Sequence, residues 1–341
     1  MDDVREPATN TAPAQPKAFD WLLLAMLVAL GSSSFSMIRV AVETIPPAIV
    51  SAGRLWVGAA LMYAIMRFAG RRFPPFVERH AGRLRLARDW SFMLAVSFIG
   101  YAVPFFIFPW AQQYIASGLA GVYMAFMPIW TLGLAYFFAG ESLTPGKIAG
   151  FAMGFTGVMI LLGADIIGGA ARSGVLAQAA LLLATLCYAA SAVISRRAPA
   201  IRPRVFAAGT VLGAAIFSTP FLLFAEWRPD DWSLASALSI VGLGAGPTGL
   251  AGLIIIIVIK RAGAGFMALA NYIVPVTAVF AGAALFGEEL RPRVFLALAI
   301  ILAGVAVSQR RRKTPVAATA GGLAPVTVAS VKQKEREAEA V

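Results

Sequence analysis

The chain has 341 residues, of which 59% are hydrophobic and only 13% charged, with a formal net charge of +12. Its mean hydropathy of +0.78 lies outside the range of soluble globular domains and of disordered chains. A helix that crosses a bilayer needs about 20 mostly apolar residues, because hydrocarbon offers no hydrogen-bond partner to a bare backbone. We therefore expect an all-α integral membrane protein.

Ten apolar stretches of about this length follow one another along the chain. They cover residues 21–38, 48–69, 90–110, 115–138, 147–164, 175–195, 205–224, 237–259, 264–286 and 294–309. The flanking segments 1–18 and 311–341 have the composition of disordered tails. The basic stretch "HAGRLRLARDW" (80–90) between the second and third spans is expected to be a solvated loop or a short amphipathic helix on the inner leaflet.

The basic residues predict the orientation of these spans. Of 29 Lys and Arg, five fall in odd-numbered connections and Arg54 falls inside a span, which leaves 23 for the even-numbered connections and the tails. Cytoplasmic loops carry the excess of Lys and Arg. Both termini are thus expected in the cytoplasm, with the chain crossing the inner (plasma) membrane many times. The basic loops lack interleaved stacking aromatics, so we expect no nucleic-acid binding.

The inventory of reactive side chains argues against an enzyme. The only cysteine is Cys187, and the only histidine, His80, lies in a basic loop. The sequence contains no HExxH motif, no GxSxG at a helix start and no nucleotide-binding loop. We predict no catalytic residue, no metal ligand and no cofactor, which disfavours an intramembrane enzyme. A channel is disfavoured because no filter-like motif is present.

An internal repeat is visible in the apolar part of the chain. Residues 118–162 align with 265–309 at a constant offset of 147 without a gap. The alignment pairs residues that are scarce in membrane helices: Gly118 with Gly265, Pro128 with Pro275, Gly140 and Glu141 with Gly287 and Glu288, Pro145 with Pro292, and Gly157 with Gly304. The match predicts two homologous five-helix halves, residues 19–164 and 165–310.

The two halves are expected to have opposite orientations. Five spans separate the copies, so the second copy crosses the bilayer in the reverse sense. Inverted repeats are typical of secondary transporters, in which a site near the midplane is exposed alternately to the two sides. The sequence therefore predicts transport by alternating access.

Several segments carry a resemblance to a known family. "GSSSFSMIRVAVETIPPAIVSAGRL" (31–55), "YIASGLAGVYMAFMPIWTLGLAYFFAGESLTPGK" (114–147) and "ALANYIVPVTAVFAGAALFGEELRPR" (268–293) resemble EamA-type carriers of the drug/metabolite transporter superfamily. The resemblance covers roughly residues 20–310. It implies a ten-helix carrier, usually an exporter of amino acids, related metabolites or drugs, with a cavity enclosed by helices 1, 3, 4, 6, 8 and 9. One departure is "ALGSSSF" (29–35), where such carriers often have a Trp-Gly pair.

Polar and aromatic residues midway along these helices are the substrate-binding candidates. Each has an alternative, because hydroxyls in membrane helices often bond to a carbonyl one turn earlier and aromatics often lie at the membrane interface. A mid-helix amide needs partners in a medium without water, so Asn271 either faces the substrate or links two helices. The full set is Ser34, Tyr101, Tyr123, Tyr188, Ser191, Thr248, Asn271 and Tyr272.

A second set of residues is predicted to serve gating or structure. Arg54 is the charged residue placed clearly inside a span; it either receives a substrate carboxylate or fixes the second helix, and we favour the structural role. Glu141 and Glu288 lie between a helix end and a helix start, where a carboxylate caps free amides. Pro128 and Pro275 are expected to kink their helices.

The sequence thus favours a secondary transporter that exports small metabolites such as amino acids. Efflux of a lipophilic drug or transport of a nucleotide precursor stays open as an alternative. No Asp or Glu lies squarely inside a span, which favours facilitated transport over proton coupling. The expected partners are a small-molecule substrate and the lipid bilayer, and the sequence is compatible with a homo-oligomer.

Overall fold

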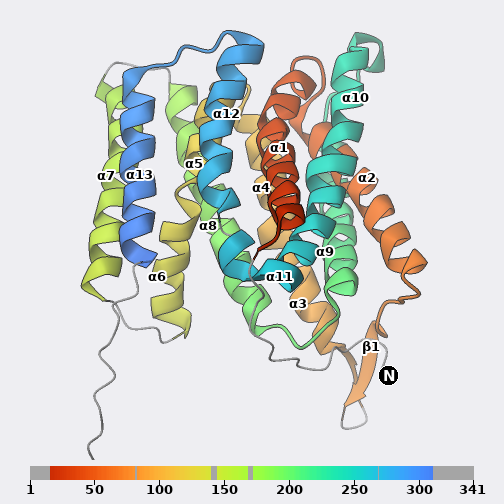
Figure 1. The fold of residues 1–341 in the computed structure, drawn as a ribbon. Helices are drawn as coiled ribbons and strands as arrows, with labels where there is room; N and C mark the ends of the chain where they lie inside the picture. Colours follow the sequence, from red (N-terminus) through yellow and green to blue (C-terminus); the bar gives the residue numbers. More distant parts are fainter. Residues whose placement is uncertain (1–15, 81–82, 140–143, 168–171, 268, 310–341) are drawn as a thin grey trace, which may run out of the picture. The chain divides into compact units, whose positions relative to one another are not determined.

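The computed structural model describes residues 16–80, 83–139, 144–167, 172–267 and 269–309, which form helices and one β-hairpin (Figure 1). Short π-helical segments, η1 (Ser97–Ala102) and η4 (Gly244–Leu250), and 3-10 segments, η2 (Thr219–Phe224) and η3 (Pro229–Asp231), accompany the α-helices. The α-helices are α1 (Ala18–Ala41), α2 (Pro47–Phe68), α3 (Arg88–Val96), α4 (Val103–Ala111), α5 (Ser117–Met124), α6 (Met127–Ala139), α7 (Pro145–Ile167), α8 (Arg172–Arg197), α9 (Pro203–Ser218), α10 (Leu234–Leu243), α11 (Ala251–Met267), α12 (Ala270–Phe286) and α13 (Pro292–Gln309).

Seven helical segments among the described residues have the length and apolarity needed to cross a membrane. Three shorter apolar helices accompany them, within α7, α12 and α13. Each of the ten predicted stretches overlaps one of these segments, with bounds that differ by up to six residues. The seven long segments are Ala18–Ala41, Pro47–Phe68, Arg88–Ala111, Ser117–Phe138, Ser173–Arg197, Pro203–Phe224 and Leu234–Gly263.

Two of the long spans contain a π-helical turn at related positions. The segment η1 begins at Ser97, between α3 and α4, and η4 begins at Gly244, between α10 and α11. These start points are separated by 147 residues, the same offset that relates the two copies of the sequence repeat. The π-helical turn therefore recurs at the offset of the sequence repeat, although the residues of the two turns differ.

Helices from the two sequence halves pack in pairs, with α7 against α13, α2 against α9, and α5 against α12. The pair α7 and α13 runs side by side in Figure 1. Small residues permit this approach, because a Cβ on Gly150 would overlap the carbonyl oxygen of Gly304, and a Cβ on Gly304 would lie 2.7 Å from the carbonyl oxygen of Gly150. The main apolar core lies between α1, α4, α5, α8 and α12.

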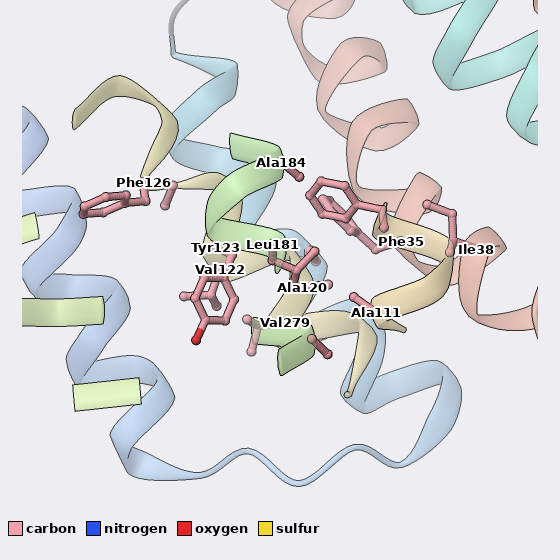
Figure 2. Packing of buried hydrophobic residues seen from close by; sticks show 14 of the residues in the cluster. Phe35, Ile38, Ala111, Ala120, Val122, Tyr123, Phe126, Leu181, Ala184 and Val279 are labelled. Atoms are coloured by element: carbon pink, nitrogen blue, oxygen red, sulfur yellow. The ribbon is translucent and has the colours of Figure 1, made fainter. Parts of the chain in front are cut away.

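Figure 2 shows this core around the end of α5. Phe35 of α1 points toward Ala120 of α5 and Ala184 of α8, and all three are buried. Phe126 lies in the break between α5 and α6 and points away from this group, toward α7, where it closely approaches Gly154. The predicted span 115–138 corresponds to the segment Ser117–Phe138, which a two-residue turn at Ala125 and Phe126 divides into α5 and α6.

The basic stretch after α2 is exposed, as expected for a solvated connection, but it contains strands and not the amphipathic helix given as the alternative. Residues Val77–His80 (β1) and Arg83–Leu86 (β2) form an antiparallel hairpin, with Val77 opposite Leu86. The sequence "RLRL" alternates with a period of two, which fits a strand and not an amphipathic helix. All four residues of β2 are exposed, so the hairpin extends outside the helical core.

Candidate functional site

A cavity of about 270 Å³ lies among the helices, where α1, α2, α4, α8 and α12 meet the ends of α5, α6 and α11. Most of its lining is apolar. Four polar side chains line it as well, and they come from four helices: Ser34 from α1, Arg54 from α2, Tyr188 from α8 and Asn271 from α12. All four were singled out from the sequence, and the cavity is our candidate substrate site.

Arg54 is the charged group in this lining and is 5% exposed. Its guanidinium carbon lies 3.9 Å from the centre of the Phe105 ring, within the range of a cation–π contact. Its Nη2 and Nε atoms donate to the Thr248 hydroxyl at 3.2 and 3.4 Å. That hydroxyl in turn donates to the carbonyl of Leu243 at 2.9 Å. Thr248 lies in the π-helical segment η4, so the irregular turn positions the neutral partner of the buried cation.

Ser34 and Tyr188 contribute hydroxyl groups to the cavity. The Ser34 hydroxyl donates to the carbonyl of Gly31 at 2.7 Å, which leaves its oxygen lone pairs available as acceptors. The ring of Tyr188 packs against Phe108, with 6.1 Å between the ring centres. Asn271 lies in the first turn of α12, two residues after the N-cap residue Leu269. The polar groups are therefore dispersed around an apolar space.

The other predicted binding residues lie outside the lining of this cavity. The Tyr123 ring is fully buried, and its hydroxyl donates to Gln178 Oε1 at 2.6 Å, which links α5 to α8. Tyr101 packs against Phe105, 5.3 Å between ring centres, behind the cavity wall. The Ser191 hydroxyl donates to the carbonyl of Tyr188 at 2.8 Å.

Three further predicted residues are Tyr272, Pro275 and Pro128. Tyr272 is partly buried against the main apolar core, one residue beyond Asn271, and is not part of the cavity lining. Pro275 lies inside α12 and lines the cavity. Pro128 is the second residue of α6, directly after the break between α5 and α6, where the absence of an amide hydrogen costs little.

A larger groove of about 810 Å³ runs between α1, α10 and α12. Trp21, Ile273 and Leu285 line it and are 53%, 40% and 66% exposed, so it opens on the outside of the helices. Two of its hydroxyls, those of Ser32 and Thr277, are hydrogen-bonded to each other. An apolar, laterally open groove faces bilayer lipid, and we do not assign the substrate to it.

Glu288 links the segment after α12 to the start of α5. Its Oε1 accepts from the amide and the hydroxyl of Ser117, both at 2.7 Å, and its Oε2 accepts from the amide of Gly118 at 2.9 Å. The carboxylate therefore caps the N-terminus of α5, where free amides attract a negative charge. The side chain crosses Gly282 of α12, where any Cβ would overlap it. Glu141, the predicted counterpart, lies outside the described residues.

An ion pair at the other end of α1 was not predicted. Arg261 Nε lies 2.6 Å from Asp20 Oδ1, and Asp20 Oδ2 accepts from the amide of Lys17 at 2.9 Å. The pair joins the first turn of α1 to α11, just before Gly263, whose φ of 87° turns the chain toward α12. An acidic residue in the first turn of a span and the "KR" after the eighth span were the available signals.

The Glu288 cap on α5 and the Asp20–Arg261 ion pair are far apart. Arg39 and Glu288 line the same small cavity at the end of α1. Asp20 and Arg39 are 19 residues apart in one helix, which corresponds to about 28 Å. The Asp20–Arg261 pair and the Glu288 cap consequently lie at opposite ends of α1, with Ser34 and the central cavity between them.

Comparison with known proteins decides the family. The model of the EamA-like transporter family matches residues 20–163 and again residues 175–309, so two copies cover most of the chain. The chain belongs to the EamA-like transporter family. Like the other members of this family, it is a membrane transporter of small molecules and not an enzyme.

Several bacterial members of the EamA-like family are similar over most of their length. The aromatic amino acid exporter YddG of Ancylobacter novellus is 29% identical over 298 residues, covering 85% of this chain and 94% of the relative. The uncharacterized transporter YoaV of Bacillus subtilis is 23% identical, and the match covers 78% of this chain and 88% of YoaV. The uncharacterized inner membrane transporter YedA of Escherichia coli is 26% identical, with coverages of 83% and 88%.

A solved crystal structure shares the fold of this EamA-like chain. It has a TM-score of 0.59 and 22% identity, and the match covers 86% of this chain and 98% of the other. The helical arrangement described above is thus one that has been observed experimentally.

Proposed function

We propose that the chain is a ten-helix exporter of amino acids or closely related metabolites that works by alternating access. The observation that carries this proposal is the central cavity, in which one guanidinium, one amide and two hydroxyls from four helices surround an apolar space. The aromatic amino acid exporter YddG is similar to almost the full helical region, which supports an amino acid as the substrate. A volume of about 270 Å³ is at the lower end for ligand sites and favours a metabolite over a larger drug.

Two observations support an inverted pair of five-helix halves. The π-helical turns recur at the offset of the sequence repeat. The helices that pack most closely across the halves are α7 with α13 and α2 with α9, each paired with its own counterpart, as expected for helices near a pseudo-two-fold axis. We place both termini on the cytoplasmic side of the inner membrane, because the Lys and Arg residues are concentrated in the tails and the even-numbered connections.

The proposed mechanism assigns the two terminal contacts to the two gates. Glu288 holds α5 to the end of α12 on the outer side, and Asp20 with Arg261 holds α1 to α11 on the inner side. Opening the central cavity to one side requires the contact on that side to separate. Facilitated transport needs no further ionisable group, because each contact forms and breaks with the movement of the helices.

The substrate assignment is tested with purified protein in proteoliposomes. Vesicles loaded with unlabelled amino acids are expected to accumulate labelled phenylalanine by counterflow, equally at matched pH and after a pH step. Replacement of Asn271 with Ala removes the amide from the cavity lining and is expected to lower the exchange rate about 10-fold or more.

The control is Ser91→Ala, which removes an exposed hydroxyl from the first turn of α3, outside the central cavity and both terminal contacts. Exchange should be unchanged in this control. Absence of counterflow for every amino acid would refute the substrate proposal. A steep dependence on the pH step would instead refute facilitation.

The inner gate gives a second prediction. Asp20→Asn removes the charge of the Asp20–Arg261 pair but keeps the size of the side chain. Because Arg261 is 43% exposed and screened by solvent, we expect a moderate effect, roughly a two- to fivefold increase in access to the cavity. Access is measured as the rate at which a polar maleimide modifies a cysteine introduced at Met124, in a Cys187→Ala background.

Glu226→Gln is the matched control for this experiment. It makes the same acid-to-amide change in the exposed Glu226–Arg228 pair, in which both side chains are more than 70% exposed. The control should leave the modification rate unchanged. Equal rates in Asp20→Asn and in Glu226→Gln would show that the Asp20 pair is no gate.

A further inference from the structure

We propose that Arg54 is the receptor for a carboxylate group of the transported solute, an inference that rests on the proposed transport function and specifies its substrate class. The structure places a buried guanidinium in the wall of the central cavity, between Phe105 on one side and Thr248 on the other. The argument for a negatively charged ligand comes from counting the partners of this group.

A guanidinium has five N–H donors and is charged at any physiological pH. The contacts of Arg54 use one donor on Nε and one on Nη2, both toward the single hydroxyl of Thr248. Among the described residues no carboxylate contacts Arg54, and the three remaining N–H groups have no protein acceptor. A structural arginine that fixes its helix would be expected to bond to carbonyls or carboxylates of its neighbours, and Arg54 does neither.

A buried charge without a counter-charge is costly in a membrane protein. The cation–π contact with Phe105 offsets part of this cost, but it occupies a face of the guanidinium and leaves the N–H edge free. That planar edge matches a carboxylate, which can accept two parallel hydrogen bonds from it. The cavity next to Arg54 is where such a group has access, because Arg54 is itself part of the lining.

The remainder of the lining specifies the rest of the solute. Phe108, Met124 and Met127 offer an apolar surface that suits an aliphatic or aromatic group. The Asn271 amide oxygen and the Ser34 and Tyr188 hydroxyls are neutral acceptors that suit an ammonium or hydroxyl group. Among the described residues that line the cavity none is acidic, so a solute with only a positive charge meets Arg54 without compensation. The expected class is therefore a small carboxylate with an apolar side group, and lipophilic amines are excluded.

The decisive experiment compares three related probes on the unmodified protein. Phenylalanine and phenylpropionate carry a carboxylate, whereas phenethylamine is phenylalanine without it. We expect the two carboxylates to raise the melting temperature of the detergent-solubilised protein and to compete in counterflow, and phenethylamine to do neither. Stabilisation by phenethylamine equal to that by phenylalanine would overturn the proposal without any mutation.

Variants at Arg54 provide the second test. Arg54→Lys keeps the charge but loses the planar pair of donors, and it should weaken carboxylate binding about 10-fold; Arg54→Met should weaken it about 100-fold. Arg67→Met is the matched control, since Arg67 lies at the end of the same helix α2, is exposed and bonds to the carbonyl of Arg71. Affinities within twofold of the unmodified protein in both Arg54 variants would overturn the proposal.

Failure of the amino acid assignment has a different signature. If phenylalanine is neither bound nor exchanged, the thermal-shift experiment is run with a panel of small monocarboxylates and their matched amines. Stabilisation by carboxylates only, lost in Arg54→Met, would support the role of Arg54 with another substrate. Absence of any carboxylate effect would refute it. If Arg54→Met does not fold, the role of Arg54 is tested by comparing the carboxylate probes with phenethylamine on the unmodified protein and on Arg54→Lys.

Discussion

Replacement of Glu288 with Ala is expected to reduce transport more than 10-fold and to lower the free energy of unfolding by about 2–4 kcal/mol. The carboxylate accepts from two backbone amides and one hydroxyl at the start of α5. Removal leaves these donors without a partner at a helix N-terminus, where a charged acceptor is worth most. Glu288→Gln retains one acceptor oxygen and should have an intermediate effect. Counterflow and thermal denaturation of the purified variants measure both quantities.

The neighbouring Glu289 is the control for this experiment. It pairs with Arg291 at 2.9 Å, but its side chain is 75% exposed, and exposed pairs contribute little to stability. Glu289→Ala is expected to transport normally and to unfold within about 0.5 kcal/mol of the unmodified protein. If Glu288→Ala and Glu289→Ala lose similar amounts of transport and stability, the cap on α5 is not the cause of the loss.

Replacement of Gly150 with Ala is expected to have the second large effect, a loss of about 1–3 kcal/mol of stability. The new methyl group would overlap the carbonyl oxygen of Gly304 and lie 2.6 Å from the Cβ of Ser308. Backbone atoms of α13 cannot rotate aside as a flexible side chain does, so α7 and α13 would have to separate. The melting temperature of the purified protein in detergent, at fixed lipid content, measures the effect.

Gly133 of α6 offers a matched control in the same part of the molecule. A Cβ there would lie 3.9 Å from the Phe151 ring, an ordinary van der Waals contact. Gly133→Ala should therefore leave the melting temperature unchanged or raise it, because alanine favours the helix by up to about 1 kcal/mol. If Gly150→Ala is as stable as Gly133→Ala, the close packing of α7 on α13 is not needed for stability.

The spans could be predicted from the sequence because hydropathy is a local property. The hairpin at Val77–Leu86 was missed because its period of two extends over only a few residues next to a strongly basic segment. The sequence predicted a kink at Pro128, and the turn between α5 and α6 lies at Ala125 and Phe126, just before this proline. The position of the turn could not be predicted, because apolar residues continue through it.

The site was only partly predictable, because the partners of its residues are distant in sequence. Two of the predicted binding residues, Asn271 and Tyr188, line the cavity. Tyr123 has the same residue type as Tyr188 and also lies within a predicted span, yet its hydroxyl bonds to Gln178, 55 residues away. The Glu288 cap joins residues 171 positions apart. Patterns within one helix identify polar residues that need a partner but do not identify the partner.

The π-helical turns at Ser97–Ala102 and Gly244–Leu250 make the cavity depend on the number of residues in a span as well as on their identity. A π turn contains one residue more than an α turn, so every residue after it is rotated by about 100° relative to an uninterrupted α-helix. Phe105 and Phe108 follow the first turn, and Ala251 and Ile255 follow the second. Deleting a single residue from either turn would therefore rotate these side chains out of the cavity wall while leaving every one of them in the chain.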